Sequence, residues 1–337
     1  MSSSIIDVCK KAGVSRMTVS RVIRGSSSVS PQTKQLVIKT IQDLGYLPST
    51  AARAMRSKDN LVAKGNLCCA LVFGSDLQAS ESFFSVVAMA AEQEAAVNGL
   101  CLLQSHWQEN FEASWHRLRS VCSVAGLCGI ILAGKFGADE IAAIKKYVNN
   151  IVLVDAPLPT GADVISIESD NMSGCRQAIK HLIDRGTKRL LVLTGPSPDH
   201  YFCQAVTSTA EAFLSAFEDV RVVNTDLTTE SGYKIVYELF RKELNFDGVF
   251  GNDELAIGAL RAFSDLSIRV PQDVKVVGFD DIGHASFTVP SLTTVRIEKS
   301  QLGYEAVKSL VEILRGKSDV SQIKKVLKAT LIVREST

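Results

Sequence analysis

The sequence lacks long apolar segments and any ordered pattern of cysteines. No stretch reaches the roughly 18 apolar residues that a membrane span needs, and polar Ser2, Ser3, Ser4 and Asp7 stand where a secretion signal would have its apolar core. The eight cysteines form no Cys-x-x-Cys pair and no Cys/His group at zinc spacing. We therefore expect a cytoplasmic protein without a metal, whose cysteines are small buried hydrophobic residues and not redox centres.

Motifs of catalysis are also missing. The chain has no Gly-x-Ser-x-Gly elbow, no His-Glu-x-x-His, no Gly-x4-Gly-Lys-Ser/Thr phosphate loop and no Gly-x-Gly-x-x-Gly turn. Its five histidines show no ligand spacing. We expect no enzyme and no cofactor; a dinucleotide-dependent enzyme with a basic extension stays as an alternative, which a nicotinamide-binding assay would test.

Charge divides the chain into a basic head and an acidic body. Residues 1–64 hold eleven Lys and Arg against three acids, a net charge of +8, which leaves −7 for the rest of a chain whose total is +1. No acid occurs between Val8 and Gln42. A polyanion is therefore the expected partner of the head alone, although a merely well-solvated head would have the same charge.

The head has the pattern of three short helices. The first starts at Ile5, Gly13 breaks it, and Ser15 caps a second that runs to about Ile23. A third starts at Pro31 and ends near Gly45. Two helices joined by a Gly-containing turn form a helix-turn-helix. The residues at the start and on the outer side of the second helix are candidates for reading the major groove: Ser15, Arg16, Met17, Thr18, Ser20 and Arg21. A helical hairpin without a DNA role is the alternative.

Residues 5–25 resemble the headpiece of the lactose-repressor (LacI/GalR) family, and the resemblance continues through residues 29–48. It implies that the two residues after the Ser that opens the recognition helix, here Arg16 and Met17, select the operator. It also implies that Arg21 contacts DNA bases and backbone. The resemblance assigns 1–47 to the helix-turn-helix domain.

Residues 48–64 are expected to form a hinge helix and linker. About eight residues from Ser49 cannot hold a helix alone in water. The resemblance implies that two such helices pair in the minor groove, with Arg53 at a contact position and Met55 in place of the usual Leu as an apolar wedge. A disordered spacer is the alternative.

Residues 65–337 have the pattern of an α/β body. Apolar runs alternate with amphipathic helices, which is typical of parallel sheets covered on both faces. The pattern restarts after Asp163 and predicts two doubly wound lobes. The resemblance extends over this region and implies a periplasmic-binding-protein-like, effector-binding and dimerisation domain. We place lobe one at about 65–161 and 293–322, and lobe two at about 162–290 and 323–337.

Ligands of such sheets bind beyond the carboxyl ends of the strands. Carried over from the family, the effector candidates are Phe83, Phe84, Asp155, Thr209, Leu227, Asn252 and Asp280. Any one of these has a structural alternative, and Asp253 we expect to be mainly structural. Thr209 stands where most members have an Arg that binds the effector, and Glu81-Ser82 replaces the family's Asn-Pro. An unusual ligand, a substitute cation such as Arg296, or no sugar ligand would each fit these departures.

We thus predict a sequence-specific DNA-binding regulator, expected to be a repressor, whose operator affinity responds to a small molecule such as a sugar or a related metabolite. Its DNA partner is a double-stranded, pseudo-palindromic operator. A homodimer is expected, paired mainly through the helix at 83–98. A regulator with a non-sugar ligand or a non-functional sensor is the alternative.

Overall fold

The computed structural model describes residues 5–23, 29–43, 67–74, 81–107, 111–122, 124, 126–196, 201–242, 246–316 and 324–337. Contacts divide the chain into two compact units, a small head in the first 63 residues and an α/β body in nearly all of the rest. None of the described helices is long and apolar enough to cross a bilayer.

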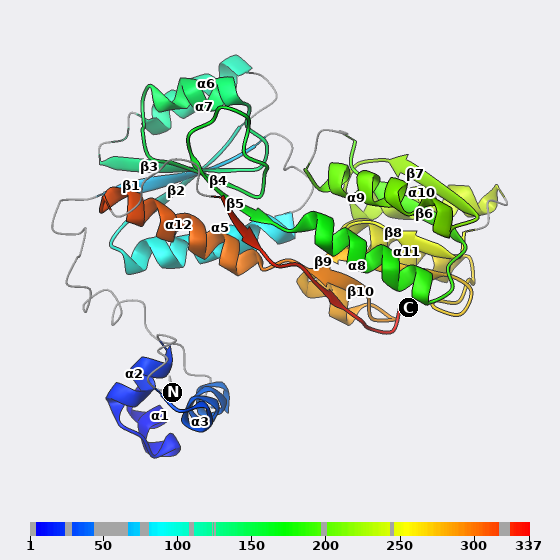
Figure 1. Ribbon diagram of the computed structural model, residues 1–337, viewed down its shortest axis with the longest axis horizontal. Coiled ribbons are helices and arrows are strands. Elements are labelled where there is room, and N and C mark those ends of the chain that lie inside the picture. Colours follow the sequence, from blue (N-terminus) through cyan, green and yellow to red (C-terminus); the bar gives the residue numbers. More distant parts are fainter. Residues whose placement is uncertain are drawn as a thin grey trace. The chain divides into compact units, whose positions relative to one another are not determined.

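The head consists of three helices (Figure 1), which enclose a small apolar core. They are α1 (Ile5–Ala12), α2 (Arg16–Ile23) and α3 (Pro31–Asp43). Gly13 turns the chain between the first two with a φ of 62°, a left-handed conformation that glycine adopts without strain. The core residues are Val8, Ala12, Val19, Val22 and Val37, which the helical periodicity brings to facing sides.

The first lobe of the body is built on a fully parallel sheet in the order β11-β5-β4-β3-β1-β2. Its strands are β1 (Cys68–Phe73), β2 (Cys101–His106), β3 (Leu127–Ala133), β4 (Ile151–Val154), β5 (Ile165–Ser169) and β11 (Lys324–Leu327). The helices α6 (Phe111–Cys122) and α7 (Ala138–Lys145) cover one face, and α5 (Glu81–Val97) and α12 (Lys299–Leu314) cover the other (Figure 1). The central strands are buried on both faces, which explains their continuous apolar runs.

The second lobe has a six-stranded sheet in the order β12-β10-β9-β8-β6-β7, parallel except for β12 against β10. The strands are β6 (Arg189–Thr194), β7 (Asp219–Asn224), β8 (Gly248–Phe250), β9 (Lys275–Asp280), β10 (Thr293–Arg296) and β12 (Thr330–Ile332). α10 (Thr229–Arg241) and α11 (Asp253–Asp265) share one core with residues of β6, β8 and β9. α8 (Asn171–Asp184) packs against β10 and β12, and α9 (Tyr201–Ala212) packs against α8 and β6. The two lobes are thus both doubly wound, as predicted.

The strands change lobe at other residues than expected. β5, expected in lobe two, pairs with β4 of the first sheet. β10, expected in lobe one, pairs with β9 of the second sheet, and β11, expected in lobe two, pairs with β5 of the first. The chain therefore crosses after Ser169, after Arg296 and after Leu327. Buried parallel strands have similar sequences in both sheets, so their neighbours are decided by tertiary pairing and not by the strand's own pattern.

The cysteines only partly match the expected burial. Cys68, Cys69, Cys175 and Cys203 are buried, whereas Cys9, Cys122 and Cys128 are half-buried and Cys101 is exposed. All eight are free thiols. Cys101 is exposed because it lies in β2, which has a neighbour on one side only.

Candidate DNA-binding head and effector site

The amino end of α2 is capped by its preceding serine. The Ser15 hydroxyl accepts a hydrogen bond from the Thr18 amide at 3.1 Å and lies 2.9 Å from the Thr18 hydroxyl. The Val14 amide donates to the Cys9 carbonyl at 3.2 Å, which closes the turn between the helices. Ser15 therefore fixes where the recognition helix begins.

The side of α2 away from the head core carries the predicted DNA-reading residues. Val19 and Val22 point into the core, whereas Arg16 and Arg21 are exposed and Met17 is 60 % exposed. An exposed Met of this size is unusual on a soluble surface, and it suits contact with a thymine methyl group. Thr18 is half-buried beside its cap, and the side chain of Ser20 lies outside the described residues, as do Arg53 and Met55.

We expect Ser15→Ala to lower the stability of α2 by about 1 kcal/mol, because it removes one helix cap. Hydrogen exchange of the α2 amides in the full chain measures this loss. Ser15→Asp is the matched variant, since aspartate also caps helices but places a negative charge next to DNA. It should keep the protection of α2 and weaken DNA binding, and equal protection in wild type and Ser15→Ala would contradict the capping role.

In the body, aromatic rings gather at the carboxyl ends of β1 and β2. Phe83 and Phe84, in the first turn of α5, have ring centroids 4.8 Å apart, and Phe84 lies 5.9 Å from Phe73 at the end of β1. His106 at the end of β2 stacks on Phe73 at 5.0 Å. Phe73 and His106 are register partners, and both were missed from the sequence. Their shared position as last residues of neighbouring strands is the signal that could have found them.

Two carboxylates lie at strand ends in different lobes. Asp155 follows β4 of the first sheet, and Asp280 ends β9 of the second; their φ values are 55° and 108°. The Ser169 hydroxyl donates to Asp155 at 3.3 Å. Burial raises the pKa of Asp280 well above its usual range, and repulsion from Asp253 and Asp155 adds to the effect.

Three of the predicted effector residues make contacts within the fold. The Asn252 side chain accepts from the Leu255 amide at 3.0 Å and so caps α11. Leu227 is 7 % exposed and belongs to the second-lobe core. The Thr209 hydroxyl donates to the Ala205 carbonyl of its own helix at 2.6 Å, and the residue is 2 % exposed. A short hydroxyl bonded within its helix does not replace an arginine that would reach out of it.

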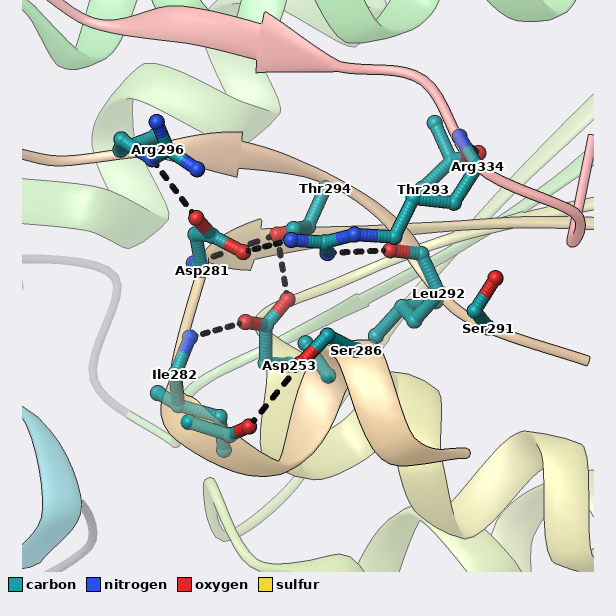
Figure 2. A network of polar contacts seen from close by, with 12 residues as sticks. Asp253, Asp281, Ile282, Ser286, Ser291, Leu292, Thr293, Thr294, Arg296 and Arg334 are labelled. Atoms are coloured by element: carbon teal, nitrogen blue, oxygen red, sulfur yellow. Dashed lines mark hydrogen bonds and ion pairs between the residues drawn. The ribbon is translucent and has the colours of Figure 1, made fainter. Parts of the chain in front are cut away.

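Asp253 holds the chain around the end of β9 (Figure 2). Its carboxylate accepts from the Ile282 amide at 2.7 Å and from the Thr294 hydroxyl at 2.5 Å. Burial raises its pKa to about 7, against the opposing effect of these two hydrogen bonds. The residue is completely buried, which agrees with the structural role expected for it.

Asp281 is the second acid of this network (Figure 2). It pairs with Arg334 at 2.6 Å and Arg296 at 2.7 Å. These two guanidinium groups hold the pKa of Asp281 below its usual value, although burial acts in the opposite direction. Arg296 is thus engaged by Asp281, and the structure gives no support for it as the cation of the effector site.

Sequence comparisons identify both parts of the chain. Residues 4–49 match the model of bacterial regulatory proteins of the lacI family, and residues 179–337 match the periplasmic binding protein-like domain. The transcriptional regulator CelR of Thermobifida fusca is 30% identical, with 98% of this chain and 96% of that protein aligned. The helix-turn-helix-type transcriptional repressor PurR of Pasteurella multocida is 28% identical over 99% of this chain and 98% of its own length.

Solved structures of related regulators have the same architecture. A complex of CelR with cellobiose has a TM-score of 0.68 at 27% identity and covers 99% of this chain and 100% of its own. A Lac repressor dimer bound to operator has a TM-score of 0.69 over 100% of this chain and 99% of that chain, and its 23% identity shows the fold alone.

A helix-turn-helix head before a periplasmic-binding-protein-like body defines a class of DNA-binding transcriptional regulators. The chain belongs to the LacI family of that class. The relatives are transcriptional regulators and not enzymes, so the dinucleotide-dependent enzyme is set aside.

Proposed function

We propose that this chain is a homodimeric repressor that reads a pseudo-palindromic operator through α2. A small molecule that binds the body changes its affinity for the operator. The observation that carries the proposal is the capped helix α2, with Arg16, Met17 and Arg21 exposed on one side. Two such helices in one dimer would read two half-sites. The hinge contacts of Arg53 and Met55 remain part of the proposal on the strength of the family resemblance.

Dimerisation is proposed to use α5. Met89 in this helix is 54 % exposed, a large apolar surface for a residue in the middle of a helix. In the second lobe Phe287 and Val289 are 85 % and 95 % exposed beside Pro290. Exposed apolar groups of this kind are typical of subunit contacts. Sedimentation of wild type and a Met89→Glu variant tests this pairing.

The effector is proposed to be a small polyhydroxylated molecule such as a sugar. The residues that support it are Phe83 and Phe84 in the first turn of α5 and the strand-end acids Asp155 and Asp280, because rings cover the apolar face of a sugar and carboxyl oxygens accept from its hydroxyls. CelR, the relative described above, was solved with cellobiose. Thr209, Leu227 and Asn252 are left out of the proposed contacts for the structural reasons given above.

Selection of bound DNA from a random pool, with and without a sugar mixture, tests the whole proposal. A palindromic sequence should be enriched, and sugars should change its recovery. Lack of any palindrome would overturn the operator proposal. Enrichment that no metabolite alters, together with no thermal shift, would favour the alternative of a non-functional sensor.

We expect Arg16→Ala to weaken binding to the selected operator by about tenfold to a hundredfold, since a bidentate Arg–guanine contact contributes about 1–3 kcal/mol of discrimination. Fluorescence anisotropy against the selected site and single-base variants measures it. Gln35→Ala, an exposed change on α3, is the control and should bind as wild type does. If Arg16→Ala weakened binding equally on every sequence, Arg16 would contact phosphate and not a base.

A further inference from the structure

Lys299 is a buried lysine that links the two lobes. It is the first residue of α12 in the first lobe and is only 9 % exposed. Its ammonium donates to the carbonyl of Asp280 and, at 3.0 Å, to the carbonyl of Asp281, both at the end of β9 in the second lobe. It also lies 5.9 Å from the centre of the Phe83 ring.

The two carbonyls belong to a strained turn. Asp280 and Asp281 have φ values of 108° and 51°, in the region that L side chains rarely adopt. Two consecutive residues of this kind persist only where their surroundings hold them. The backbone of this turn decides where the two side chains start, and it aims Asp281 at Arg296 and Arg334.

The base of Lys299 is fixed firmly in the first lobe. α12 packs on the first sheet and crosses α5 at Gly303, where an added Cβ would meet the Val87 carbonyl oxygen at 2.1 Å. Lys299 and Phe83 each lie one helical turn before this crossing, which explains why the ammonium and the ring meet.

A buried ammonium is stable only with compensating partners. Lys299 has two carbonyl oxygens and an aromatic face as partners. Its positive charge also lowers the pKa values of Asp253 and Asp280, which burial raises. The charge and the hydrogen bonds of the Lys299 ammonium thus both act on the turn that follows β9.

We propose that Lys299 is a positioning residue that reaches from the first lobe to hold the strained Asp280–Asp281 turn of the second. In doing so it sets the direction of the Asp280 carboxylate. The role belongs to the protein before any effector binds and does not depend on the nature of the effector.

Hydrogen exchange of the full chain, without DNA or effector, tests this role. The amides to follow are those of Asp281 and Ile282, which donate to Thr294 and Asp253. Lys299→Met has a side chain of similar length but no hydrogen-bond donor. In this variant we expect exchange at these two amides to be about tenfold or more faster. Lys299→Arg should restore most of the protection, because its charge and donors are retained.

Lys308→Met is the matched control on the same helix. Lys308 pairs with Glu305 at 3.2 Å and lies over Tyr304, and it makes no contact with the β9 turn among the interactions described. This variant should leave the two amides unchanged. Unchanged exchange in a folded Lys299→Met, or equal acceleration throughout the second lobe, would overturn the proposal. If Lys299→Met does not fold, Lys299→Gln takes its place against Lys299→Arg, and equal exchange in those two overturns it.

Because neither DNA nor effector is present, failure of this test leaves the proposed repressor function untouched.

Discussion

Gly303→Ala is expected to destabilise the body by about 2–3 kcal/mol, because overpacking a tight contact costs that much. The added Cβ would lie 2.1 Å from the Val87 carbonyl oxygen and 2.9 Å from the Ala91 amide nitrogen. These are backbone atoms of α5, so no side-chain rotation relieves the clash and the two helices must separate. The loss should appear even though alanine is the better helix former by about 1 kcal/mol.

Urea unfolding followed by circular dichroism measures this loss. Gly283→Ala is the control, since a Cβ there meets nothing within 4 Å and the residue is exposed. It should stay within about 0.5 kcal/mol of wild type. Equal unfolding midpoints for Gly303→Ala and wild type would show that α5 and α12 have room to move apart. The tight helix crossing would then no longer explain why the Lys299 ammonium lies near the Phe83 ring.

Asp253→Asn is expected to stabilise the body relative to wild type, increasingly so as the pH rises. The folded pKa of Asp253 is raised to about 7 from an ordinary 3.8. Between these pH values the folded wild-type chain keeps a proton on Asp253 that the unfolded chain releases. The free energy of unfolding of wild type therefore falls as the pH rises through this window. Each pKa unit corresponds to about 1.4 kcal/mol, so the difference between variant and wild type should grow by about 3 kcal/mol from pH 5 to pH 8.

Asparagine is the suitable replacement because it keeps both hydrogen bonds. Its oxygen can accept from the Ile282 amide, and its amide nitrogen can donate to the Thr294 hydroxyl. Urea unfolding at four pH values gives the two curves. Asp273→Asn is the control with the opposite sign: hydrogen bonds from Arg269 lower the Asp273 pKa to about 2, and the residue is exposed. Parallel curves for Asp253→Asn and wild type would mean that Asp253 is ionised in the folded protein throughout.

The head could be predicted almost completely from the sequence. Short helices joined by a glycine turn are local structures. The residues that specify them, Gly13, Ser15 and the valines at helical spacing, lie close together in the sequence. The expected end of the third helix near Gly45 lies just beyond the last described residue of α3, Asp43.

The effector site could be predicted only in part. Asp155 and Asp280 could be proposed because each stands at the end of a buried strand. Asn252 and Leu227 occupy similar positions in the sequence, yet one caps a helix and the other packs in a core. A strand-end residue has the same sequence context in both cases, and only the atoms around its side chain decide between them.

The sequence by itself determined the basic helix-turn-helix head, the doubly wound class of the body and the family, because each is written in local spacing, charge and apolar periodicity. Only the tertiary structure decided which strands belong to which lobe, and that Arg296 is engaged while Lys299 reaches the β9 turn. These depend on contacts between residues far apart in the chain, for which no local pattern exists.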